Sequence, residues 1–351
     1  MATEKSDCAP QLPHRSSAST RPDSDLMGKT AIVTGSNTGI GLECARQLLD
    51  RGLSKLILAV RDESKGETAK QALLASGREL EPNAIEIWYL DYSSYDSITS
   101  FAARARGLEN LDIVVLNAGV YRLSRVILLS TGHEEDIQVN YLSTALLAIL
   151  LLPVLEAKKR SGTQPGRLTV VSSSIAAWSR FKAEDNRPLL TTLDGGGSGG
   201  EGEAVGETVG AKPFDHHQQY CTSKLLAQLF IAELTRRIPP SAVIIDCVNP
   251  GLCYGSGLSR DGAGTWLGFF TGVLFRIFGR SCASGAQALV DAATQHGGEV
   301  HGQYLDNGKV AKFAPVVYTV DGRQMGQRLW KETMSELSFA GVEGVIRDLT
   351  S

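Results

Sequence analysis

A glycine-rich turn near the amino end constrains the fold of this chain more than any other feature. Residues 34–41 read TGSNTGIG, follow the apolar run 31–33 and precede a helical pattern of apolar residues. Glycines at 35, 39 and 41 permit a sharp turn and close approach of a ligand to the backbone. The free N–H groups of the following helix would point at a phosphate. The segment therefore predicts strand, turn and helix with an anion site. A plain strand-to-helix connection is the alternative, because the spacing is not G-x-G-x-x-G.

Strands and helices alternate from Lys29 onward, which favours a parallel sheet covered on both faces. We expect an α/β fold with a doubly wound, Rossmann-type sheet of about seven strands in a single domain. The strand candidates are residues 30–34, 55–60, 85–90, 112–116, 167–172, 242–248 and a short one near 302–305.

A tyrosine and a lysine lie four residues apart in the run Tyr220-Cys-Thr-Ser-Lys224. On a helix this spacing brings both side chains to one face. A free tyrosine has a pKa near ~10, so a fixed positive charge beside it is needed for proton transfer at neutral pH. The pair predicts an acid assisted by an ammonium group. Taken alone, it is also compatible with a half-buried ring beside a solvated amine.

The glycine turn, the run 117–119 (NAG), Ser173 and the Tyr220/Lys224 pair occur in the order typical of the short-chain dehydrogenase/reductase (SDR) family. The chain resembles a conventional member from about Gly28 to about Leu337, including the segments 249–251 (NPG) and 328–330 (RLW). Within the family, its downstream half is most similar to retinol-dehydrogenase-like members and to fungal reductases of secondary metabolism.

The resemblance implies four catalytic residues. Tyr220 would donate a proton to a carbonyl oxygen in reduction and accept it in reverse. Lys224 would lower the pKa of Tyr220 and hold the nicotinamide ribose. Ser173 would hydrogen-bond the substrate oxygen, with a register that can slip by one residue. Asn140 would hold a water of the proton relay, although a polar residue in a buried helix kink has the same sequence pattern.

The second strand ends with Val60, Arg61 and Asp62. An acidic residue at this point favours NAD, whereas an arginine can pair with the 2′-phosphate of NADP. Val60 stands where NAD-dependent relatives usually carry aspartate, so we predict NADP(H) with Arg61 at the 2′-phosphate. The alternative is a weak surface pair of Arg61 with Asp62 or Glu63.

The resemblance also implies the other cofactor contacts. Asp91 would meet the adenine, and Ser256 would substitute for a threonine that the family usually carries after its Pro-Gly turn. The full set of predicted cofactor-binding residues is Gly35, Ser36, Asn37, Thr38, Gly39, Ile40, Gly41, Arg61, Asp91, Asn117, Ala118, Gly119, Tyr220, Lys224, Pro250, Gly251 and Ser256.

Two segments interrupt the α/β pattern. Residues 182–213 are glycine-rich and acidic, so we interpret them as a flexible loop insertion, with a mobile flap over the substrate as the alternative. Residues 256–282 correspond to the family's substrate lid, and their apolar stretch 264–278 implies an apolar or aromatic substrate. That stretch is too short to span a bilayer, which takes ~20 residues. A membrane-surface helix remains the alternative.

Composition excludes several classes of protein. The 35 basic and 38 acidic residues nearly cancel and form no basic block, which argues against nucleic-acid binding. Six scattered cysteines without a metal-ligand pattern favour a reducing compartment and no structural zinc. We expect a disordered tail over 1–26, an oxidoreductase domain over 27–340 and a C-terminal tail over 341–351. Cytoplasmic localisation, no transmembrane segment and a homodimer or homotetramer complete the expectation.

These features predict an NADP-dependent oxidoreductase that interconverts a ketone and a secondary alcohol on an apolar or aromatic small molecule, acting as a reductase. Two alternatives stay open. One is a membrane-associated retinol or lipid dehydrogenase, and the other is a non-catalytic sensor that binds the dinucleotide.

Overall fold

A computed structural model of the 351-residue chain describes residues 26–75, 80–157, 164–183, 187–195, 214–257 and 279–350. Residues 1–25 of the expected N-terminal tail, residues 196–213 of the insertion and the apolar lid stretch 264–278 lie outside these residues. Leu26, expected in the tail, is fully buried.

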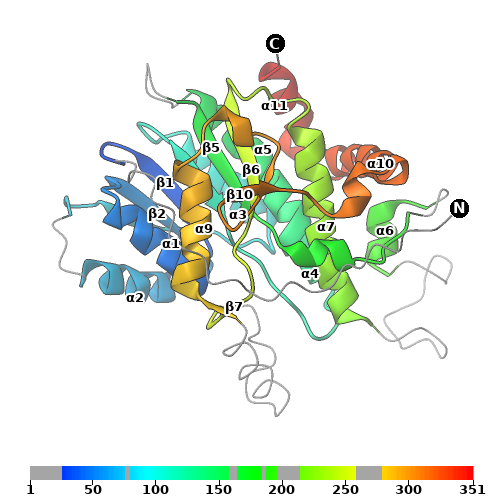
Figure 1. The fold of residues 1–351 in the computed structure, drawn as a ribbon, viewed down its shortest axis with the longest axis horizontal. Coiled ribbons are helices and arrows are strands. Elements are labelled where there is room, and N and C mark those ends of the chain that lie inside the picture. Colours follow the sequence, from blue (N-terminus) through cyan, green and yellow to red (C-terminus); the bar gives the residue numbers. More distant parts are fainter. Residues whose placement is uncertain are drawn as a thin grey trace, which may run out of the picture.

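The central sheet has eight strands in the order β10-β9-β6-β5-β4-β1-β2-β3 (Figure 1). All neighbouring strands are parallel except β9 and β10. The strands are β1 (Thr30–Thr34), β2 (Lys55–Val60), β3 (Ile85–Tyr89), β4 (Ile113–Leu116), β5 (Gly166–Val171), β6 (Val243–Asn249), β9 (Tyr304–Asp306) and β10 (Lys309–Ala311). The predicted Rossmann-type fold is confirmed. Within this sheet β10 was not expected, because its three largely exposed residues form no apolar run. A second, two-stranded parallel sheet of β7 (Cys253–Tyr254) and β8 (Arg280–Ser281) was not expected either.

Helices cover both faces of the sheet. One face packs against α1 (Gly39–Asp50), α2 (Glu63–Leu74) and α9 (Cys282–Thr294), and α1 and α9 lie side by side (Figure 1). The other face packs against α3 (Tyr95–Ala105), α5 (Ser143–Ala157) and α7 (His216–Leu234). Beyond α7 on this side lie α10 (Val320–Glu336) and α11 (Val342–Asp348). The segment expected as a C-terminal tail thus contains α11, which packs on α5 through buried Val342 and Ile346.

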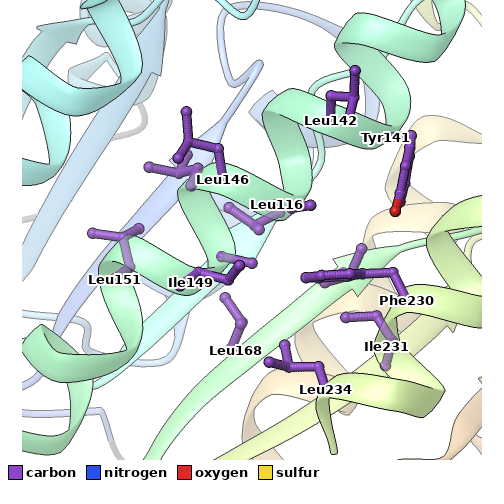
Figure 2. Close-up of a cluster of buried hydrophobic side chains, with 14 of the residues drawn as sticks. Leu116, Tyr141, Leu142, Leu146, Ile149, Leu151, Leu168, Phe230, Ile231 and Leu234 are labelled. Carbon is purple, nitrogen blue, oxygen red and sulfur yellow. The ribbon is translucent and has the colours of Figure 1, made fainter. Parts of the chain in front are cut away.

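Helix α5 lies at the centre of the larger core. Figure 2 shows Ile149 of α5 on the side toward Phe230, Ile231 and Leu234 of α7, with Leu168 of the sheet between them. Leu146 and Leu151 lie on the opposite side of α5. The helical stretch Glu135–Ala157 is long and apolar enough to cross a membrane, but 94% of its most apolar window is buried inside the protein. This apolar run is therefore a core helix.

The strand order reverses between β1 and β4, since β1 continues to β2 on one side and the chain returns to β4 on the other. In open parallel sheets, ligands bind in the crevice outside the carboxyl ends of the strands at such a point. The glycine turn follows β1 directly, so the fold places it at this crevice.

Candidate active site

The glycine turn after β1 leaves the first turn of α1 open to a ligand. Helix α1 begins at Gly39, and the side chain of its N-cap, Thr38, makes no capping hydrogen bond. Gly35 and Gly39 adopt positive φ angles of 63° and 59°, which favour glycine. The Ser36 hydroxyl is buried without a hydrogen-bond partner among the described residues. Bare N–H groups and close backbone access fit the pyrophosphate of a dinucleotide.

Gly41 has to be glycine because its backbone packs tightly inside the turn. A Cβ there would lie 2.4 Å from the carbonyl oxygen of Gly35 and 2.6 Å from Nδ2 of Asn117. Asn117 in turn donates from Nδ2 to the carbonyl of Thr34, at 2.9 Å, and its backbone N–H donates to the Thr34 hydroxyl. The predicted cofactor residue Asn117 therefore braces the ends of β1 and β4 together with its side chain.

The segment after β6 closes the other side of the crevice. A Cβ on Gly39 would lie 3.1 Å from Cα of Ser256, so Ser256 lies against the glycine turn. Gly251 has a φ of 76° and lies under Arg280, whose Nε would be 3.3 Å from a Cβ at that position. The Pro250–Gly251 turn and Ser256 thus border the same crevice as the turn after β1.

The predicted Arg61 and Asp91 lie just beyond the carboxyl ends of β2 and β3. Arg61 is exposed, and no ion pair holds it within the described part of the chain. The expected alternative, a pair with Asp62, does not form, since Asp62 caps α2 through the Lys65 N–H and pairs with the Lys65 ammonium at 3.1 Å. Asp91 accepts from the backbone and the hydroxyl of Ser93, at 2.9 and 2.8 Å, which fixes its carboxylate at the end of β3.

Tyr220 and Lys224 lie one turn apart on α7, and both side chains are buried. The Lys224 Nζ lies 5.8 Å from the centre of the Tyr220 ring and donates to the carbonyl oxygen of Val171 at 3.3 Å. Burial lowers the pKa of Lys224 to about 8. Burial raises the pKa of Tyr220, and the charge of Asp136 adds to that rise. The direction is opposite to the lowering that the sequence predicted, because burial disfavours the charged phenolate.

Ser173 follows β5 and is half-buried, whereas its neighbour Ser172 is fully buried. The Ser172 hydroxyl accepts from Nε2 of Gln228 at 3.1 Å, and the same Nε2 donates to the Ser173 carbonyl at 3.3 Å. The Ser173 hydroxyl is within 3.4 Å of the Ile175 N–H. Of the two serines, Ser173 is the one whose hydroxyl can meet a ligand.

Asn140 lies in a π-helical turn, Gln138–Leu142, that joins α4 (Glu135–Ile137) to α5. Its amide exchanges two 2.8 Å hydrogen bonds with the backbone of Val120 and donates to the Ser223 hydroxyl at 3.0 Å. Such π turns interrupt helices most often at functional sites. A Cβ on Gly119 would lie 3.0 Å from Oδ1 of Asn140 and 3.7 Å from Nζ of Lys224, so Asn140, Gly119 and Lys224 converge at one point.

The structure adds residues that the sequence analysis did not select. Tyr121 packs edge-on against Tyr220, with ring centres 5.0 Å apart, and against His216 at 5.7 Å. Gln228 positions the end of β5, and it continues the helical stripe of Tyr220 and Lys224 at the same four-residue spacing. That spacing was the available signal for Gln228. No sequence signal pointed to Tyr121, because its partners lie far along the chain.

A glycine turn at the switch point of a doubly wound sheet, with a serine, a tyrosine and a lysine at its carboxyl edge, defines a dinucleotide-dependent oxidoreductase. Residues 29–182 match the family model described as short chain dehydrogenase. The chain is 47% identical over 333 residues to the short-chain dehydrogenase fogG of Aspergillus ruber, a match that covers 94% of this chain and 91% of that protein. It is 42% identical to the short chain dehydrogenase/reductase mfmJ of Annulohypoxylon moriforme, over 93% of this chain and 90% of that protein. This chain belongs to the short-chain dehydrogenase/reductase family, whose members bind a nicotinamide dinucleotide, and the expected likeness to fungal members is confirmed.

Solved structures show the same fold. An NADPH-bound carbonyl reductase from chicken fatty liver matches with a TM-score of 0.55 at 18% identity. The match covers 82% of this chain and 100% of that chain. A short chain dehydrogenase from Escherichia coli CFT073 in complex with NADPH matches with a TM-score of 0.56 at 20% identity, covering 82% and 99%.

Proposed function

We propose that this protein is an NADP(H)-dependent reductase that converts a ketone to a secondary alcohol on an apolar or aromatic small molecule in fungal secondary metabolism. The observation that carries the proposal is the convergence of Ser173, Tyr220, Lys224 and Asn140 beside the crevice that begins at the glycine turn. The reverse oxidation uses the same residues.

The bound dinucleotide supplies the hydride, and this chain's own residues handle the proton. Ser173 donates a hydrogen bond to the substrate oxygen, and that bond strengthens as negative charge develops there. Tyr220 then gives its phenolic proton to the oxygen. The raised pKa of Tyr220 keeps that proton in place until the substrate oxygen becomes basic, which favours the reductive direction.

Lys224 supports the proton transfer. Its ammonium, anchored on Val171, stabilises the phenolate that Tyr220 leaves behind, and Asn140 beside it offers a route by which the proton is replaced. With a pKa lowered to about 8, Lys224 can itself give up a proton near neutral pH.

Arg61 supports the preference for NADP. Its guanidinium is exposed at the end of β2 and is not held by Asp62, so it is available to a 2′-phosphate. NADP-bound and NADPH-bound complexes among the structural neighbours are consistent with this preference.

The rings beside Tyr220 support an apolar or aromatic substrate. Tyr121 and His216 form one edge-on pair, and Trp178 stacks on His217 at 6.1 Å on the same end of α7. Planar substrates pack well against such rings. The substrate is a small molecule, and we infer a cytoplasmic enzyme that forms a homodimer or homotetramer.

The first test measures the thermal midpoint of the purified protein with NADPH, NADP, NADH or NAD at equal concentrations. A ligand that binds only the folded state raises the midpoint. We expect a rise specific to the phosphorylated pair. A larger rise with NADH would overturn the cofactor assignment, and no rise with any of them would overturn the enzyme assignment.

The second test screens aromatic ketones with NADPH and compares Tyr220→Phe with the exposed control Tyr89→Phe. Loss of a general acid costs about 100-fold or more in turnover. Equal activity of both variants would exclude Tyr220 as the acid.

A further inference from the structure

Asp136 is a buried acid that the proposed mechanism does not use. Its side chain is fully buried. Oδ1 accepts from the backbone N–H of Arg122 at 3.3 Å, and Oδ2 has no hydrogen-bond partner among the described residues. A buried carboxylate with an unpaired oxygen is costly, and such a group commonly binds a proton instead.

The one nearby guanidinium serves a different acid. Arg122 donates to Glu135 through Nε at 2.7 Å and Nη2 at 2.6 Å, a two-pronged pair that occupies the carboxylate of Glu135. Glu134 caps α4 and accepts from Gln219 at 2.8 Å. Of these three consecutive acids, Glu135 is therefore the one that pairs with Arg122. Burial, followed by the charge of Glu134, raises the pKa of Asp136 to about 8.

Asp136 contacts the same backbone segment, residues 120–122, as the predicted catalytic centre. It precedes Asn140 by one helical turn, and the two side chains hold neighbouring backbone N–H groups, of Arg122 and of Val120. Between those residues lies Tyr121, whose ring contacts Tyr220. Helix α4 also packs directly on α7, which carries Tyr220 and Lys224.

The charged and titratable groups around Asp136 come from three elements. Its own helix contributes Glu134 and Glu135, the loop after β4 contributes Tyr121 and Arg122, and α7 contributes Tyr220 and Lys224. An ionised Asp136 raises the pKa of Tyr121, Tyr220 and Lys224 alike. Its charge therefore reaches both members of the Tyr220–Lys224 pair.

We propose that Asp136 stores a proton beside the Tyr220–Lys224 pair and, by releasing it at alkaline pH, extends the pH range over which Lys224 keeps the positive charge that supports proton donation by Tyr220. Asp136 is a positioning residue, since it acts through the pair. The inference rests on the proposed reductase function. Below about pH 8 Asp136 is neutral and leaves the pair unaffected. Above that pH its negative charge favours the charged form of Lys224, whose pKa is lowered to about 8 by burial.

The test compares Asp136→Asn, which keeps the shape and removes the ionisation, with the exposed control Asp96→Asn. The turnover number for reduction of a model aromatic ketone is measured at saturating NADPH from pH 6 to 10. We expect the alkaline fall in turnover to move to lower pH by about one unit in Asp136→Asn, because a nearby charge shifts a pKa by about that much. The control should keep the wild-type profile. An unchanged alkaline limb in Asp136→Asn would overturn the proposal.

Glu135→Gln provides a variant with the opposite effect. It releases Arg122 to pair with Asp136 and hold it ionised at neutral pH. Oxidation of the corresponding alcohol, which needs Tyr220 as a base, should then require a higher pH than in the wild type. A shift to lower pH would contradict the proposal, and this result does not depend on whether Asp136→Asn folds.

An infrared measurement is independent of turnover. The wild-type protein should show the carbonyl stretching band of a protonated carboxylic acid at pH 6 and lose it by pH 9.5, and the band should be weaker in Glu135→Gln. Absence of the band at pH 6 would overturn proton storage even in an active enzyme. Buried Glu134 and Asp246 also have raised pKa values, so the band is assigned to Asp136 by its loss in Asp136→Asn. A protein that passes this comparison but reduces no ketone would refute the proposed function and leave the proton on Asp136 established.

Discussion

The ammonium of Lys224 donates a hydrogen bond to the carbonyl oxygen of Val171 over 3.3 Å, and in this way ties α7 to the end of β5. This contact holds the helix that carries Tyr220 beside the strand end that carries Ser173. Gln228, one turn further along α7, adds hydrogen bonds to the same strand end. The contact therefore positions the helix relative to the end of the strand.

Replacing Lys224 by methionine should remove the positive charge while leaving the fold intact. We expect turnover to fall by about 100-fold because the Tyr220 phenolate loses its ammonium partner. The thermal midpoint should change little, since methionine fills the buried stem while one hydrogen bond, worth about 1 kcal/mol, is lost. Turnover and midpoint are measured on the same preparation, and a collapsed midpoint with normal turnover would refute this assignment.

Gly41→Ala should abolish cofactor binding. Its methyl group would lie 2.4 Å from the Gly35 carbonyl oxygen, so the turn has to shift and α1 moves with it. We expect a loss of about 1–3 kcal/mol in the free energy of unfolding and no midpoint rise with NADPH. Gly344→Ala on α11 is the control, because its nearest neighbour atom would be 3.8 Å away. Normal NADPH binding by Gly41→Ala would argue against a pyrophosphate at this turn.

Arg61→Ala should weaken NADPH binding by about tenfold, equivalent to about 1.4 kcal/mol, and leave NADH binding unchanged. The phosphate loses its ionic partner, whereas NADH never used it. Dissociation constants from fluorescence titration check this result, with exposed Arg106→Ala as the control. Equal weakening of both cofactors would show that Arg61 supports the fold of the β2 end instead.

Tyr121→Ala should raise the KM for aromatic ketones by about tenfold while changing the KM for small aliphatic ketones much less. The ring lies edge-on to Tyr220 and offers an aromatic surface worth about 1 kcal/mol to a stacked substrate. Tyr121→Phe retains the surface and should behave like the wild type. Equal changes for both classes of ketone would remove Tyr121 from substrate recognition.

His133 should make stability depend on pH. Its Nδ1 lies 2.7 Å from Asp194 and its Nε2 lies 3.2 Å from Glu336. Burial acts against the charged ring, but these two acids together raise the pKa of His133 to about 9. The folded state therefore binds the proton more tightly than the unfolded state, whose histidine pKa is about 6.5. The stabilisation is complete below pH 6.5 and is lost as pH rises through about 9.

Thermal midpoints between pH 6 and 10 test this linkage in the wild type and in His133→Gln. We expect the wild type to lose more stability over this interval than the variant. Parallel curves would mean that His133 does not bind its proton preferentially in the folded state.

Local sequence patterns predicted most of the scaffold. Strands β1 and β2 begin and end at the predicted residues, because each is a buried apolar run bounded by turn residues. The short edge strand β10 and the helix α11 lack such a signal, since their stability comes from pairing with β9 and packing on α5. The roles of Ser173, Asn140 and Arg61 stay predictions.

The sequence by itself determined the sheet, the glycine turn and the Tyr220–Lys224 stripe, because each depends on neighbours within a few residues of the chain. Only the tertiary structure decided the electrostatics. Tyr220, Lys224 and Asp136 owe their shifted pKa values to burial and to charges from separate elements. Desolvation depends on everything that surrounds a group in space, so no local pattern could show that Tyr220 keeps its proton more tightly than a free tyrosine, or that an unpaired acid lies behind it.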